Sequence, residues 1–248
     1  MKEYILETCV DSVESAMAAV QGGASRLELC SNLIIGGTTP GPWLFDEIRK
    51  RSDIRIHALI RPRFGDFCYT DAEFVMIKSA VQDFRKMGAE GVVIGILKPD
   101  GTLHMEQMKE LMEAAGDMSV TLHRAFDVCV DPIETMEQAI SLGINTILTS
   151  GQRNVCLQGA ELLKELQERS RGRVTIQAGS GVNAEVIRQL YPMTGVKAYH
   201  MSGKRTIDSE MKYRKEGVNM GLPLLSEYEV WRTDEENIRA AKKVLEEL

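Results

Sequence analysis

Acidic and thiol side chains recur together at the carboxyl ends of apolar runs in this chain. Two of these runs carry a glutamate two residues before a cysteine, Glu7 with Cys9 and Glu28 with Cys30. Side chains two positions apart on a strand share a face, so each glutamate should lie beside its cysteine. Neighbouring strands are about 4.8 Å apart, which would let the two thiols share a soft ion such as Cu(I). The alternative is that both cysteines pack as small buried hydrophobes.

Charged residues inside apolar strands predict an ion network, because a buried charge costs free energy unless it is paired. In one interpretation Glu7, Glu28 and Arg61 pair only to close the protein interior. In the other they face a ligand, and carboxylates and a histidine provide general acid–base catalysis. The residues assigned to that role are Glu7, Glu28, Asp66 and His123. His200 also follows a predicted strand and is a further candidate for proton transfer.

Basic residues and glycines predict a binding surface for an anion. Gly-Ser-Gly and Ser-Gly-Lys turns end the last two predicted strands, and barrel enzymes often bind phosphate after strands seven and eight. The residues predicted to bind an anion are Arg61, Arg63, Arg124, Gly179, Ser180, Gly181, Ser202, Gly203 and Lys204. The alternative is that the glycines only permit tight turns.

A repeating scaffold must position these side chains. Eight short apolar runs alternate with amphipathic stretches through 248 residues, roughly 31 residues for each strand–helix unit. Strands are predicted over 4–10, 26–31, 54–62, 91–97, 119–126, 146–151, 174–181 and 198–203. A doubly wound sheet would favour a Gly-x-Gly-x-x-Gly turn after the first strand, which is missing from the sequence. The sequence therefore predicts an α/β protein with a single TIM (β/α)8 barrel domain over residues 1–248.

One segment departs from the repeat. Residues 204–232 separate the eighth strand from the last predicted helix, 233–248. Long loops in compact domains are usually functional or form interfaces. We therefore expect this loop to be a lid or an oligomer contact.

The formal net charge of −6 argues against nucleic acid or an anionic membrane as a partner. No apolar run approaches the length of a membrane span. The first residues lead directly into a predicted strand, so we expect no signal peptide. Five cysteines without a C-x-x-C pair do not indicate a disulfide framework. We expect a cytoplasmic protein.

Six motifs along the chain match one protein family. They occupy residues 7–12, 26–31, 36–40, 60–69, 91–95 and 123–127. On these motifs the chain resembles the CutC copper homeostasis family over almost its whole length. The resemblance implies a TIM barrel in the cytoplasm, a homodimer or higher homo-oligomer, and Cu(I) held by Cys9 and Cys30.

Two functions from different classes follow. One is a copper-handling protein that binds Cu(I) at the barrel mouth. The other is an enzyme that acts on a small phosphorylated or carboxylated metabolite. A barrel that serves only as an interaction scaffold is the third alternative.

Overall fold

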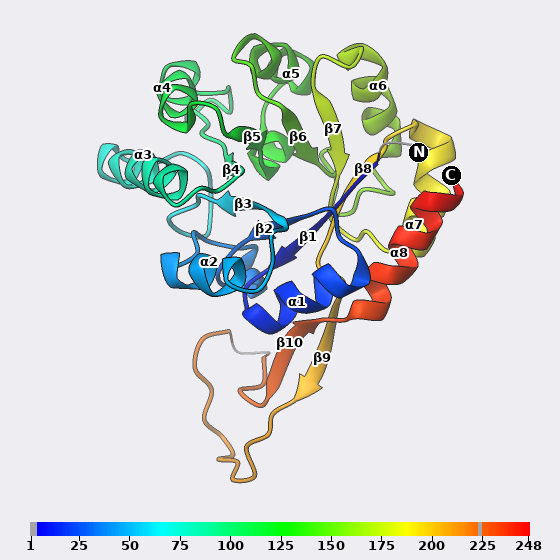
Figure 1. The fold of residues 1–248 in the computed structure, drawn as a ribbon. Coiled ribbons are helices and arrows are strands. Elements are labelled where there is room, and N and C mark those ends of the chain that lie inside the picture. Colours follow the sequence, from blue (N-terminus) through cyan, green and yellow to red (C-terminus); the bar gives the residue numbers. More distant parts are fainter. Residues whose placement is uncertain (1–3, 223–224) are drawn as a thin grey trace.

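Eight parallel strands form a closed barrel at the centre of the molecule (Figure 1). The computed structural model describes residues 4–222 and 225–248. The strands follow chain order: β1 Ile5–Val10, β2 Arg26–Leu29, β3 Arg55–Leu59, β4 Gly91–Ile94, β5 Ser119–Leu122, β6 Thr146–Thr149, β7 Thr175–Ala178 and β8 Ala198–Met201. β8 pairs with β1 and closes the barrel, with Glu7 directly opposite His200. The predicted TIM barrel is confirmed.

Helices surround the barrel, and each lies between successive strands or after the last one (Figure 1). They are α1 Val13–Gly22, α2 Pro42–Arg49, α3 Asp71–Lys86, α4 Met105–Ala115, α5 Pro132–Ser141, α6 Ala160–Ser170, α7 Ala184–Thr194 and α8 Glu235–Glu247. Side chains cap the first turns of several helices: Thr70 and Glu73 form a reciprocal capping box at α3, and Asp131 accepts two backbone N–H bonds at α5. Within the described ranges, no helix has both the length and the apolar character needed to cross a membrane.

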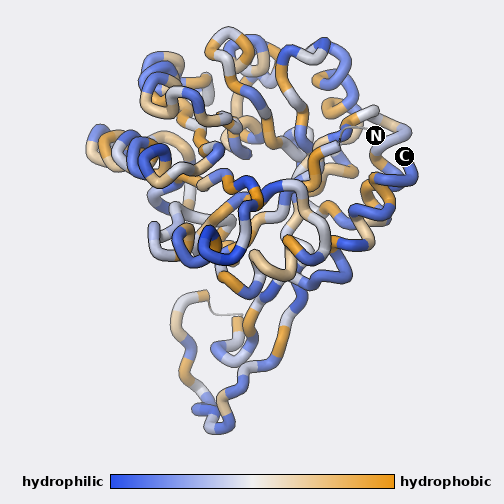
Figure 2. The backbone as a smooth tube through the Cα atoms, in the orientation of Figure 1, coloured by the Kyte–Doolittle hydropathy of each residue, from blue (hydrophilic) through white to orange (hydrophobic). Residues whose placement is uncertain are grey.

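The two faces of the barrel strands differ in chemistry. Residues such as Leu6 and Val10 belong to the large apolar core that the helices cover, and hydrophobic segments recur along strands and helices in Figure 2. Alternate residues point into the barrel instead, where Cys9 and Cys30 form a separate small cluster with Leu59 and Val93. The barrel interior therefore combines a few apolar side chains with the polar groups described below.

The segment predicted as a loop over 204–232 contains regular structure. β9 Lys204–Asp208 and β10 Glu229–Thr233 pair as an antiparallel ribbon that projects from the barrel (Figure 1). The pairing joins residues more than 20 positions apart, which a local pattern does not reveal. Residues 223 and 224 lie outside the described part of the chain. The segment's role as a lid or oligomer contact stays a prediction.

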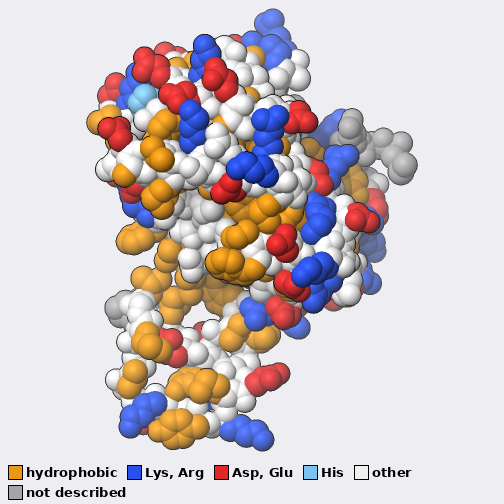
Figure 3. All heavy atoms as spheres, turned by 60° about the vertical axis from the view of Figure 1, so that its left-hand side comes forward, with side chains coloured by type: hydrophobic (Ala, Val, Ile, Leu, Met, Phe, Trp, Pro, Cys, Tyr) orange, Lys and Arg blue, Asp and Glu red, His pale blue; other side chains and the backbone are white. Residues whose placement is uncertain are grey.

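The segment that connects β9 to β10 carries exposed apolar side chains, and Figure 3 shows hydrophobic side chains on this projection. They are Met211, Tyr213, Val218, Met220 and Leu222. At the base of the ribbon the Lys204 ammonium lies 3.1 Å from the centre of the Trp231 ring. This cation–π contact covers one side of a small pocket beside the barrel mouth.

Candidate functional site

A cavity of about 360 Å³ opens at the carboxyl end of the barrel strands. This is the end at which TIM-barrel enzymes carry their active sites, and the volume is within the usual range for small-molecule sites. Its polar lining comes from Glu28, Arg61, His123, Arg124, Asp127 and His200, and its apolar lining includes Ile35, Leu59, Phe67, Val128 and Leu148.

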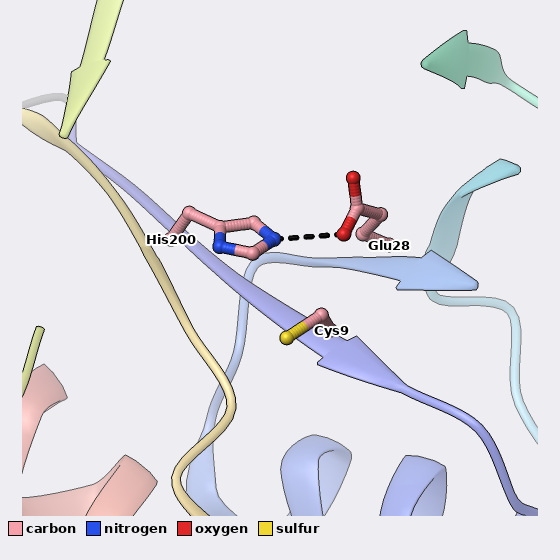
Figure 4. Close-up of side chains that lie close together, drawn as sticks. All are labelled: Cys9, Glu28 and His200. Atoms are coloured by element: carbon pink, nitrogen blue, oxygen red, sulfur yellow. Dashed lines mark hydrogen bonds and ion pairs between the residues drawn. The ribbon is translucent and has the colours of Figure 1, made fainter. Parts of the chain in front are cut away.

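Cys9, Glu28 and His200 form a cluster of potential metal ligands at the closing seam of the barrel. Their candidate ligand atoms all lie within 4.8 Å of one another. The His200 Nε2 atom is 2.8 Å from the Glu28 carboxylate, and the Cys9 thiol lies beside this pair (Figure 4). The strand register explains the cluster, because Cys9 lies opposite Glu28 while β8 lies on the other side of β1.

The cluster is electrostatically coupled. Burial disfavours the charged form of His200, but the neighbouring Cys9 and Glu28 groups outweigh it and raise the pKa of His200 well above its usual value. The Cys30 thiol also contacts Glu28, with Sγ 3.4 Å from the carboxylate. Burial and the Glu28 charge raise the pKa of Cys30 well above the usual value for a thiol. Cys30 is therefore a protonated thiol that donates to Glu28 beside the three-residue cluster.

Arg61 and His123 provide hydrogen-bond donors on another part of the cavity wall. The Arg61 guanidinium donates to the backbone carbonyls of Gly37 and Gly65, at 3.2 and 2.8 Å. The His123 Nδ1 atom accepts the backbone N–H of Ala125 at 3.1 Å. Arg61 Nε and His123 Nε2 are buried and have no hydrogen-bond partner among the described residues.

Glu7, predicted as a catalytic acid or base, lies deeper in the barrel. It is fully buried and forms an ion pair with Arg26, and its other carboxylate oxygen accepts a hydrogen bond from Gln177 at 3.0 Å. Burial alone would raise the pKa of Glu7, but the Arg26 charge overcomes it and lowers that pKa. The arrangement is a neutralised interior pair, and Glu7 does not line the mouth cavity.

Other predicted site residues lie outside the mouth cavity. Arg63 pairs with Glu73 and Asp66 on the outer surface, at 2.6 and 3.0 Å. Ser202 and Lys204 line a separate pocket of about 110 Å³ that also contacts Cys9.

The glycine turns that end the last two strands make contacts within the protein. Ser180 donates to the backbone carbonyl of Asn154 at 2.6 Å, and neither Gly179 nor Gly181 lines the mouth cavity or the smaller pocket. A side chain at Gly203 would collide with Ile238 of α8. The predicted anion-binding residues are thus divided among several places.

Two contributors to the site were not placed by the sequence pattern. His200 was expected only as a proton-transfer group, yet it completes the cluster with Cys9 and Glu28. Its position at the end of the eighth strand was a usable signal, because a closed barrel brings strand eight beside strand one. Phe67 had no assigned role, although its ring contacts both Arg61 and His123.

Known proteins match nearly the whole chain. A family protein CutC from Bacteroides fragilis (strain YCH46) is 44% identical over 249 residues, covering 98% of this chain and 96% of the relative. A Homo sapiens relative, the copper homeostasis protein cutC homolog, is 38% identical over 242 residues and covers 97% and 89%.

Solved structures agree with the fold. The CutC protein from Streptococcus agalactiae has a TM-score of 0.77 at 29% identity and covers 81% of this chain and 99% of its own. Phosphoribosyl anthranilate isomerase from Thermotoga maritima has a TM-score of 0.57 at 14% identity, covers 99% and 100% of the two chains, and shows similarity of fold alone.

The fold and site define a (β/α)8-barrel protein with a Cys–Glu–His cluster at its mouth. The model of the CutC family matches residues 4–205. The chain belongs to the CutC family, as the sequence motifs indicated.

Proposed function

We propose that this protein serves copper homeostasis in the cytoplasm by binding copper at the barrel mouth, with Cys9, His200 and Glu28 as ligands. The observation that carries the proposal is the approach of their three ligand atoms to within 4.8 Å. Membership of the CutC family supports it, as does the name of the human relative, copper homeostasis protein cutC homolog.

The donor set fits a copper ion. Thiolate is a soft ligand that favours Cu(I), and imidazole also binds copper well. The Glu28 carboxylate is a harder ligand, but the Cys30 thiol lies next to it and offers a second soft donor. Thiols and imidazolium must lose protons before they bind a metal, so copper binding at this site releases protons.

Substitution of the ligands tests the site. In anaerobic Cu(I) titrations against a competing chelator, Cys9→Ser and His200→Asn should each weaken binding roughly 100-fold, since each removes a ligand. Cys68→Ser changes a half-buried cysteine outside the cluster; it is the matched control and should bind as the wild type does. Undiminished binding by the Cys9→Ser/His200→Asn double variant, with the fold intact by circular dichroism, would overturn the proposed site.

The same titration separates two ligand sets. If Cu(I) is held by two thiols, Cys30→Ser should weaken binding as strongly as Cys9→Ser. If the Cys9–Glu28–His200 cluster holds the ion, Cys30→Ser should have the smaller effect. Parallel titration with Zn(II) measures selectivity, because a mixed sulfur, nitrogen and oxygen set also suits zinc.

A further inference from the structure

Charge is not balanced around the mouth cavity. Glu28 is paired with His200 at 2.8 Å, and Asp127 is paired with Arg124 at 2.6 Å. The remaining charged residue on the wall is Arg61, which has no carboxylate within 4.0 Å among the residues described. The cavity wall therefore carries one uncompensated positive charge.

Contacts with backbone carbonyls hold the Arg61 side chain at the cavity wall. Its guanidinium donates to carbonyls of the loops after β2 and β3, which orient it but do not neutralise it. Gly36 and Gly37 have φ values of +87° and +86°, and a Cβ atom at Gly36 would lie 3.3 Å from the Arg61 Nη1 atom. Glycine thus lets the loop carbonyls approach the guanidinium. Arg61 is only 9% exposed, and its Nε donor is left without a partner.

His123 provides a second unpartnered donor. Because its Nδ1 atom accepts a backbone N–H, the neutral ring carries its proton on Nε2. Burial, together with the Arg61 charge, lowers the pKa of His123 to about 3, so the ring is neutral at physiological pH. The side chain is 4% exposed, and Nε2 has no partner among the described residues. A buried N–H without an acceptor is costly unless a ligand supplies one.

Phe67 positions the two donors on one side of the cavity. Its ring centre is 5.0 Å from the Arg61 guanidinium carbon and 4.7 Å from the centre of the His123 ring. Both side chains therefore pack against one aromatic ring, and all three residues line the same cavity.

We propose that the mouth cavity binds a small metabolite through an oxyanion, a carboxylate or a phosphate, held by Arg61 and His123. The positive charge and neutral N–H donor both suit an oxygen anion. The volume of about 360 Å³ leaves room for a short carbon skeleton against Leu59 and Leu148. Glu28 and His200 line the same cavity. This ligand site goes beyond copper binding and does not depend on the Cys9 thiol.

The test uses inorganic phosphate and acetate as probes in isothermal titration calorimetry of the full chain. At least one should bind the wild-type protein. His123→Asn places an amide oxygen where Nδ1 accepts its hydrogen bond but removes the Nε2 donor, so affinity should fall on the order of 10-fold. His123→Gln retains a distal N–H donor and should bind more tightly than His123→Asn. Arg61→Gln should lose binding, whereas Arg63→Gln, outside the cavity, should not.

The outcomes separate the two ligand classes and the two proposals. Tighter binding of phosphate indicates a phosphorylated metabolite, and tighter binding of acetate indicates a carboxylated one. Failure of both probes to bind, or equal affinity in wild type and His123→Asn, overturns the oxyanion site. Cys9→Ser should retain oxyanion binding, and His123→Asn should retain copper binding, so each proposal can fail alone.

Discussion

Replacing Arg26 with methionine should lower the free energy of unfolding by about 3–5 kcal/mol. The substitution leaves the fully buried Glu7 carboxylate without its cationic partner and with Gln177 as its remaining side-chain hydrogen-bond partner. Methionine fills much of the same volume. The loss of stability therefore comes from the uncompensated Glu7 charge more than from a cavity. Urea unfolding at pH 7 measures the change.

Two further variants isolate the origin of that loss. Arg26→Met combined with Glu7→Met removes both charges and should recover most of the stability, because an apolar pair can replace a buried ion pair. Arg173→Met breaks the exposed pair with Glu137, whose two contacts are both 2.7 Å, and should change the free energy of unfolding far less, because solvent screens this pair. Equal losses for Arg26→Met and Arg173→Met would contradict a special role for the buried pair.

Lowering the pH from 7 to 5 should reduce the free energy of unfolding by about 4 kcal/mol through His57 and His123. Burial lowers the pKa of His57 to about 4 and that of His123 to about 3, from 6.5, with the Arg26 and Arg61 charges as further causes. The unfolded chain therefore takes up protons below pH 6.5 that the folded chain does not. Each histidine contributes a loss of about 2 kcal/mol at pH 5.

The contributions of His200 and Glu7 to the free energy of unfolding change little between pH 7 and pH 5. The raised pKa of His200 gives stability that is fully present below pH 6.5 and is lost at higher pH. The lowered pKa of Glu7 gives stability that is lost only as the pH falls through and below 4.5. Urea unfolding at both pH values measures the difference, and His123→Asn should remove about half of it. A pH response unchanged in His123→Asn would show that this ring titrates normally in the folded protein.

The barrel was predictable because its signals are local. Each strand is a short apolar run, and the two-residue spacing predicted that Glu7 shares a strand face with Cys9 and Glu28 with Cys30. The ribbon of β9 and β10 was not predictable in the same way, since its pairing depends on residues such as Thr206 and Trp231 that are far apart in sequence.

The sequence pattern singled out several residues that line the cavity, among them Glu28, Arg61 and His123, but it did not predict how they are grouped. Arg61 and Arg63 have the same strand parity, yet β3 ends at Leu59, so the chain turns and only Arg61 lines the cavity. Glu7 and Glu28 occur in similar motifs, but Arg26 neutralises the first and His200 contacts the second. Such differences depend on which side chain reaches which partner across the barrel, and this requires three-dimensional coordinates.

The closing seam between β1 and β8 has a consequence for the order of events in synthesis. Cys9 and Glu28 leave the ribosome early, whereas His200 lies 172 positions after Glu28. A nascent chain that stops before β8 contains Cys9 and Glu28 but lacks the His200 imidazole. The three side chains of the cluster can therefore meet only after nearly the entire barrel has been translated and its first and last strands have joined, so assembly of the cluster marks complete folding.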